Sequence, residues 1–112
     1  MAKVPSAEGA FIEEAKLRDY LLDVTHSDGG PKAVFFIGFG FSRDDPDALR
    51  QALLEQVRDN DAQEVASKFG TRYIVDAPIR TPSGRTPWVR TVWEVLDGPP
   101  RLITALPAQA KP

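Results

Sequence analysis

The chain has 112 residues, 42% of them hydrophobic and 27% charged, a balance that suits one folded domain and excludes a disordered segment. It contains no cysteine, so disulfides, thiolate nucleophiles and cysteine-based zinc sites are excluded. The formal net charge of −2 argues against a generic nucleic-acid binder, and no stretch approaches the roughly 20 apolar residues of a membrane span.

Three helices are predicted in the first half of the chain. Apolar residues at helical spacing predict the first over residues 13–22, with acidic side chains in its first turn that complement the helix dipole. The second, residues 31–37, opens on a proline and is apolar nearly all round, so we expect it to be the most buried element. The third, residues 46–58, has a clear amphipathic stripe.

The second half of the chain changes to the period of strands. Strands are predicted over residues 63–69, 72–80, 88–96 and 101–106. Residues 81–87 form a hairpin loop rich in turn residues, and residues 97–100 form a turn. Because helices and strands come in separate runs, we predict an α+β domain over residues 9–107, with three N-terminal helices packed on one face of a four-stranded antiparallel meander. Residues 1–8 and 108–112 are expected to be flexible ends.

The charge is divided unevenly along the chain. Residues 1–66 carry a net charge of −6 and residues 67–112 carry +4. An asymmetry of this kind can indicate an anionic partner, and it also arises when an acidic helical layer packs on a basic sheet. The basic side chains of the predicted sheet and its hairpin loop are Arg72, Arg80, Arg85, Arg90 and Arg101. Guanidinium groups suit bidentate binding of phosphate, and Trp88 beside the loop is a candidate to stack on a base.

His26 is the only histidine, and it lies in a polar loop just before Lys32. Imidazole changes charge near neutral pH, so His26 is a candidate general acid or base. With Gly29, Gly30 and the helix start that follows, Lys32 would form a phosphate-binding corner. An ordinary exposed loop histidine is the alternative. The sequence shows no cluster with metal-ligand spacing, so neither a metal nor a cofactor is expected.

A second candidate region lies on the predicted sheet. Arg80, Arg90 and Thr104 would fall together there, joined by Thr91, if the strands pair in the matching register. Two guanidinium groups and a hydroxyl around one phosphate would stabilise the negative charge that develops as the phosphate reacts.

Several segments resemble a known family. Residues 16–22 read KLRDYLL and residues 101–107 read RLITALP. Together with residues 26–33, 36–41 and 91–93, they resemble an uncharacterised bacterial domain family whose members read KLxxYLL, GxKAxxF and RLVTAYP at these places. The order of helices before a four-stranded antiparallel sheet is also similar to the barnase–EndoU–RelE-like ribonuclease superfamily, many of whose members are toxin nucleases or phage-associated effectors.

The resemblance implies a metal-independent ribonuclease or a toxin-like RNA-processing domain. Because the N-terminal residues include no apolar run of signal-peptide length, we expect the protein to be cytoplasmic. The resemblance also implies His26 as the acid or base, Lys32 and Arg80 as phosphate ligands, and Thr104 as a hydroxyl from the last strand. The residues expected to bind RNA are Lys16, Arg85, Trp88, Arg90 and Thr91. The alternative is a non-catalytic protein-binding module, either accessory or immunity-like, which the acidic net charge favours. RNA and a protein are therefore the two candidate partners, and the oligomeric state is not determined.

Overall fold

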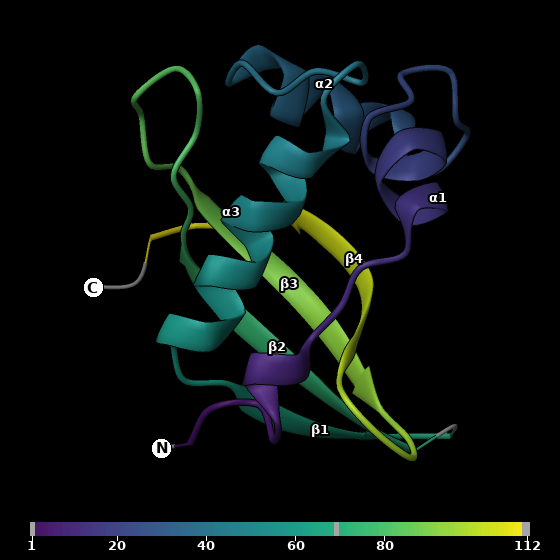
Figure 1. Cartoon of the computed structure of the whole chain (residues 1–112), viewed down its shortest axis with the longest axis vertical. Coiled ribbons are helices and arrows are strands. Elements are labelled where there is room, and N and C mark those ends of the chain that lie inside the picture. Colours follow the sequence, from purple (N-terminus) through teal and green to yellow (C-terminus); the bar gives the residue numbers. More distant parts are fainter. Residues whose placement is uncertain (1, 69, 111–112) are drawn as a thin grey trace.

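The computed structural model describes residues 2–68 and 70–110, and it confirms the predicted α+β class (Figure 1). The helical half contains η1 (Ala7–Gly9), α1 (Glu14–Lys16), η2 (Leu17–Leu21), α2 (Gly30–Gly38) and α3 (Pro46–Asp59). The strands are β1 (Gln63–Ser67), β2 (Gly70–Pro78), β3 (Trp88–Val95) and β4 (Arg101–Pro107), and they form one antiparallel sheet in the order β1-β2-β3-β4. Phe69, which the sequence places in the first strand, lies outside the described residues.

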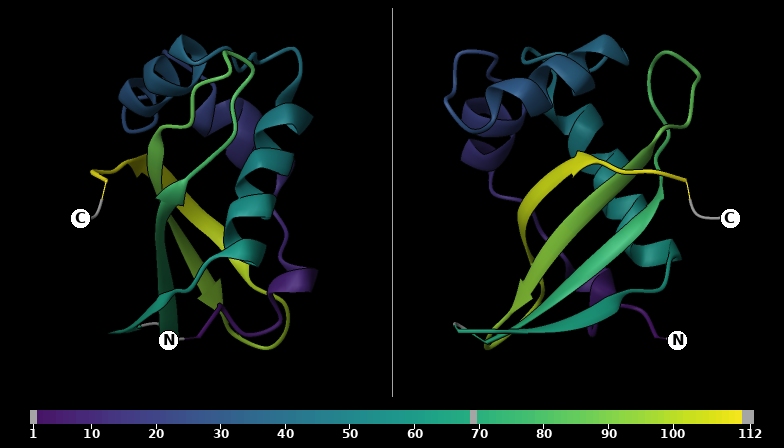
Figure 2. Two further views of the ribbon diagram at one scale, coloured as in Figure 1. Left: turned by 90° about the vertical axis from the view of Figure 1, so that its left-hand side faces the viewer. Right: turned by 180° about the vertical axis from the view of Figure 1, so that it is seen from behind.

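Helix α3 lies across one face of the sheet, and the opposite face is free of helices in the part of the chain that the structure describes (Figure 2). The helix buries Leu49, Leu53 and Val57, which recur at a spacing of four residues and belong to the same core cluster as Trp93 and Val75 of the sheet. The core also includes Val4 and Ala7, so the packed part of the chain begins before residue 9.

Helix α2 is not the most buried element, so that prediction is wrong. It buries Gly30, Ala33 and Phe36, whereas 62% of Val34 and 40% of Ile37 is exposed. The physical reason is its position, because α2 lies near the end of the sheet, beside β4, where neighbours cover only one of its sides (Figure 1). The apolar residues of α2 do not indicate where the helix lies relative to the sheet.

The helix predicted over residues 13–22 consists of two types of helical turn. One α-helical turn, α1, continues into a π-helical turn, η2, where the Leu22 amide donates to the Leu17 carbonyl across five residues at 2.8 Å. The wide turn lets Leu17, Leu21 and Leu22 all reach the core. It leaves Tyr20 half-buried at the rim, facing β4.

Edge strand β4 carries a bulge opposite the junction of Val92 and Trp93. Val92 pairs with Thr104 and Trp93 pairs with Leu102, so Ile103 has no opposite residue on β3. Bulges bend a strand and change the direction of neighbouring side chains. Here the bulge immediately precedes Thr104, whose hydroxyl contacts Tyr20.

Candidate functional site

Three polar side chains that are far apart in the sequence meet where the helices approach β4. The Lys32 ammonium of α2 donates a hydrogen bond to Thr104 Oγ1 of β4 at 3.0 Å and another to the Tyr20 hydroxyl of η2. Tyr20 Oη and Thr104 Oγ1 lie 3.1 Å apart. With Lys16 and His26, which contact the Tyr20 ring, these residues form what we call the Tyr20 cluster.

The structure thus brings together four of the residues that the sequence proposes for the site: Lys16, His26, Lys32 and Thr104. Tyr20 joins them, although sequence reasoning treated it only as part of an apolar stripe. One signal was available, because Tyr20 lies in the KLRDYLL segment four residues after Lys16, which is the spacing of neighbours on a helix surface. The bond to Thr104 spans 84 residues of sequence, and no local pattern reports it.

The His26 ring is held by the backbone of its own loop. Its Nδ1 accepts hydrogen bonds from the amides of Asp28 and Gly29, at 3.0 and 2.9 Å. A nitrogen that accepts two N–H groups cannot itself carry a hydrogen, so the neutral ring carries its proton on Nε2. The ring meets the Tyr20 ring edge to face, with 5.1 Å between the centroids. His26 is therefore arranged as a hydrogen-bond donor through Nε2, an arrangement that disfavours a role as the base.

Two ammonium groups lie close to the Tyr20 ring. Lys16 Nζ is 5.1 Å from the ring centroid and Lys32 Nζ is 4.9 Å from it, both within the range of a cation–π contact. Neither lysine forms an ion pair with a carboxylate of residues 2–68 or 70–110. Their charge is therefore available to an anion.

An open cavity of about 350 Å³ lies against this cluster. Its lining residues are Glu13, Ala15, Lys16, Asp19, Tyr20, His26 and Arg101. Both carboxylates of the lining are already paired, because Glu13 contacts Arg101 at 2.8 Å and Asp19 contacts Arg43 at 3.1 Å. These pairs leave Lys16 unpaired on the cavity wall, while Lys32, which does not line the cavity, lies 4.9 Å from the centroid of the Tyr20 ring.

The surroundings of Tyr20 shift its ionisation. Partial burial alone would raise the pKa of the Tyr20 phenol. Hydrogen bonds from Lys32 and Thr104, with the positive charges of Lys32 and Lys16, outweigh burial and hold that pKa below its ordinary value of 10.0. Perturbed ionisation next to a cavity is a common property of functional residues.

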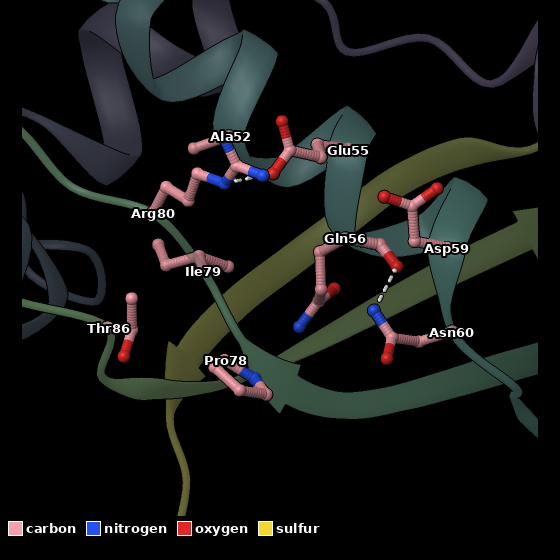
Figure 3. Close-up of a pocket in the computed structure, with 9 residues that line it drawn as sticks. All are labelled: Ala52, Glu55, Gln56, Asp59, Asn60, Pro78, Ile79, Arg80 and Thr86. Carbon is pink, nitrogen blue, oxygen red and sulfur yellow. Dashed lines mark hydrogen bonds and ion pairs between the residues drawn. The ribbon is translucent and has the colours of Figure 1, made fainter.

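Arg80 lies away from this cluster. Its guanidinium contacts Glu55 of α3 at 3.0 Å, and the two residues line a separate cavity of about 250 Å³ between α3 and the end of β2 (Figure 3). Arg90 forms two hydrogen bonds to Asp76 on the neighbouring strand, at 2.8 and 2.9 Å. The proposed grouping of Arg80 and Arg90 with Thr104 is therefore not formed.

The remaining predicted RNA contacts are scattered. Thr91 is fully buried, and its hydroxyl donates to Gln56 Oε1 at 2.6 Å and accepts from the Trp93 indole at 2.8 Å, so a substrate cannot reach it and that prediction is wrong. Trp88 is half-buried at the start of β3, and Arg85 is exposed in the loop before it. Neither of these two lines the cavity beside Tyr20.

The helix-free sheet face is less cationic than its sequence indicates. Arg72 lies 3.8 Å from Glu94, and Arg101 contacts the same carboxylate at 2.9 Å. With the pairs made by Arg90 and Arg80, all four arginines of the strands and their ends contact a carboxylate. The sequence hypothesis of a free basic surface on the sheet is therefore wrong.

The described residues contain neither a group of metal ligands nor a helix that could span a membrane. In residues 2–68 and 70–110, no three His, Cys, Asp or Glu side chains gather closely enough to hold a metal ion. Over the same residues, no helix has the length and apolar character needed to cross a bilayer.

The chain belongs to the family described as a domain of unknown function, DUF6883, which matches residues 3–109. No curated protein matches it. Among solved structures, the chain is similar to one from Klebsiella pneumoniae 342, a contact-dependent growth inhibition toxin–immunity protein complex, with a TM-score of 0.73 and 19% sequence identity. The similarity covers 96% of this chain and 100% of that chain, and at this identity it shows a shared fold.

Proposed function

We propose that this DUF6883 domain is a metal-independent, toxin-like ribonuclease that binds the RNA backbone at the Tyr20 cluster. The observation that carries the proposal is the meeting of Lys32, Tyr20 and Thr104 beside a cavity, with Lys16 on its wall. Cleavage would proceed by attack of a 2′-hydroxyl on the adjacent phosphate, which releases a 2′,3′-cyclic phosphate and a 5′-hydroxyl.

The charges of the cluster support binding of a phosphodiester. Lys16 and Lys32 have no carboxylate partner among the described residues, so neither ammonium must lose such a partner before it binds a phosphate. The Nε2–H donor of His26 lies in the same cluster and suits an oxygen of a pentavalent phosphorus. Preorganised donors and cations stabilise the charge that develops there. Arg80 is left out of the proposed site because Glu55 holds it in a different cavity.

Purified protein incubated with mixed cellular RNA tests the activity. We expect cleavage in the presence of a metal chelator, with cyclic phosphate at the new 3′ ends. Lys32→Met should lower it by about 10²–10³-fold, whereas Lys68→Met, which removes an exposed cation after β1, should leave it unchanged. Intact RNA with the wild-type protein, or equal cleavage by the Lys32→Met variant, would contradict the proposal.

A second candidate function is an immunity-like module that binds a protein. The similar solved structure contains both a toxin and its immunity protein, and a shared fold does not choose between those roles. The net charge of −2 and the paired arginines of the sheet also suit a protein partner better than bulk nucleic acid. Co-purification of one stoichiometric protein partner, with no RNA cleavage, would favour this function.

A further inference from the structure

We propose that the Tyr20 hydroxyl, in its deprotonated form, is the base that removes the proton from the attacking 2′-hydroxyl. This inference rests on the ribonuclease function proposed above and names the residue that transfers the proton.

The hydrogen bonds around Tyr20 Oη suit a phenolate. Lys32 Nζ donates to Tyr20 Oη and also to Thr104 Oγ1. Because Thr104 Oγ1 already accepts from Lys32, its own hydrogen is free to point at Tyr20 Oη, 3.1 Å away. Tyr20 Oη can therefore accept two hydrogen bonds, one of them from a full positive charge, and such bonds favour the charged form of an acceptor.

The other groups that face Tyr20 are poorly arranged to act as the base. His26 Nδ1 is occupied by two backbone amides, and Nε2 carries the ring hydrogen. The Glu13 and Asp19 carboxylates of the same cavity are held by Arg101 and Arg43.

The unpaired charges nearest to Tyr20 favour the phenolate. Lys16 comes from α1 and Lys32 from α2, and both lie near the Tyr20 ring. Glu13 and Asp19 oppose them, but each has an arginine partner. In agreement with this balance, the pKa of Tyr20 lies below 10.0, although burial opposes the shift. A lower pKa raises the fraction of phenolate near neutral pH and so the concentration of the active base.

The step balances in protons and electron pairs. The Tyr20 phenolate takes the proton of the 2′-hydroxyl while the 2′-oxygen forms its bond to phosphorus. The bond between phosphorus and the 5′-oxygen then breaks, and its electron pair stays on that oxygen, which takes a proton from water. The hydroxide formed takes the proton back from Tyr20, so the enzyme returns to its starting state.

The first experiment compares the two tyrosines of the chain. Tyr20→Phe keeps the ring and its lysine contacts but removes the hydroxyl, while Tyr73→Phe removes a hydroxyl from β2 that contacts Glu64 at 3.2 Å. Loss of a positioned base typically costs about 10²–10⁴-fold in rate, so we expect that loss for Tyr20→Phe and no more than a small change for Tyr73→Phe. The wild-type rate should rise with pH up to the lowered pKa of Tyr20, and the residual rate of Tyr20→Phe should not show this rise.

The second experiment reads the phenol directly and needs no activity. In Tyr73→Phe, Tyr20 is the only tyrosine, so the pH titration of the phenolate ultraviolet absorbance reports it alone. We expect its midpoint below that of free tyrosine, and we expect Lys32→Met to move it upward. An ordinary midpoint, or one that Lys32→Met leaves unchanged, would overturn the assignment.

The experiments distinguish failure of the proposed ribonuclease function from failure of the Tyr20 assignment. A wild-type protein that cleaves no RNA would remove the proposed function and this inference together. Cleavage by Tyr20→Phe at the wild-type rate, with an unchanged pH profile, would overturn the inference and leave the ribonuclease function standing.

Discussion

Two regions of this protein hold basic side chains with opposite surroundings. On the helix-free sheet face, the strand register pairs arginines with carboxylates, since Arg90 lies opposite Asp76 and Glu94 lies opposite both Arg72 and Arg101. Cross-strand pairs of opposite charge of this kind stabilise a sheet. In the Tyr20 cluster, the lysines come from helices that follow no such register, and they meet a phenol and a hydroxyl instead.

The comparison shows that the number of basic residues on a surface does not measure its capacity to bind an anion. An arginine that already contacts a carboxylate must lose that contact before it can bind a phosphate. Lys16 and Lys32 have no such contact to lose within the described part of the chain. Residues 67–112 carry the net positive charge, yet the proposed site depends on lysines from residues 1–66.

After Tyr20→Phe, the largest effect is expected from Lys32→Met. The change removes the charge and both donors that hold Tyr20 and Thr104 together, so RNA cleavage should fall by about 10²–10³-fold, as for other preorganised donors to a developing charge. A gel assay with a fluorescent oligoribonucleotide would measure it. Lys68→Met is the matched control, and an equal loss in that variant would mean that overall charge, not position, matters.

His26→Asn and His26→Ala distinguish the contribution of the Nδ1 acceptor from that of the Nε2–H donor. The Asn amide oxygen can replace Nδ1 as acceptor for the Asp28 and Gly29 amides, but neither variant supplies an Nε2–H. Loss of a hydrogen bond to a charged group is worth about 1.5–3 kcal/mol, so both variants should cleave roughly 10–100-fold more slowly. Only His26→Ala should also lower the free energy of unfolding, by about 1 kcal/mol in urea titrations. If His26→Asn cleaved normally, the Nε2–H donor would have no role.

Arg90→Gln tests the helix-free face of the sheet. Arg90 pairs with Asp76, whose side chain is only 7% exposed, so the variant should lose about 1 kcal/mol of stability. Its cleavage rate should stay within about twofold of wild type, since a surface substitution away from the site leaves the Tyr20 cluster intact. Thermal unfolding and the cleavage assay, run on the same preparation, would check both. A large loss of activity without unfolding would show that the sheet face binds RNA after all.

The smallest expected effect is on the pH dependence of the free energy of unfolding. Because the folded-state pKa of Tyr20 is depressed, the unfolded state binds more protons between that pKa and 10, and this group adds stability as pH rises through that window. The added stability is lost as pH falls through the folded-state pKa. Burial raises the pKa of Tyr73, so its contribution has the opposite sign. Urea titrations across alkaline pH should therefore show the stability difference between wild type and Tyr20→Phe growing with pH, and the difference for Tyr73→Phe shrinking.

Local patterns predicted the elements of the fold well. The amphipathic spacing in α3, the alternation in β2 and the turn residues between β2 and β3 each produced an element close to the observed one. The failures have physical causes. The apolar run of α2 could not report that the helix lies near the end of the sheet, and the helical spacing before it could not report a π-helical turn.

The candidate site shows the same division. Lys16, His26, Lys32 and Thr104 could be proposed from residue chemistry and from the family resemblance. The one local signal for Tyr20, its place four residues after Lys16, does not reveal its role, because that role depends on a bond to Thr104 across 84 residues. Burial of Thr91 against Gln56 was equally hidden, since it depends on which sheet face α3 covers.

The sequence by itself determined the α+β class, the order of the elements and the side chains that could bind a phosphate, because these follow from local periodicity and from the chemistry of single residues. The tertiary structure alone decided which cations are already paired. Strand register placed the arginines against carboxylates, and the approach of the helices to β4 placed two lysines against Tyr20. Those contacts join residues distant in sequence, so they exist only once the chain has folded.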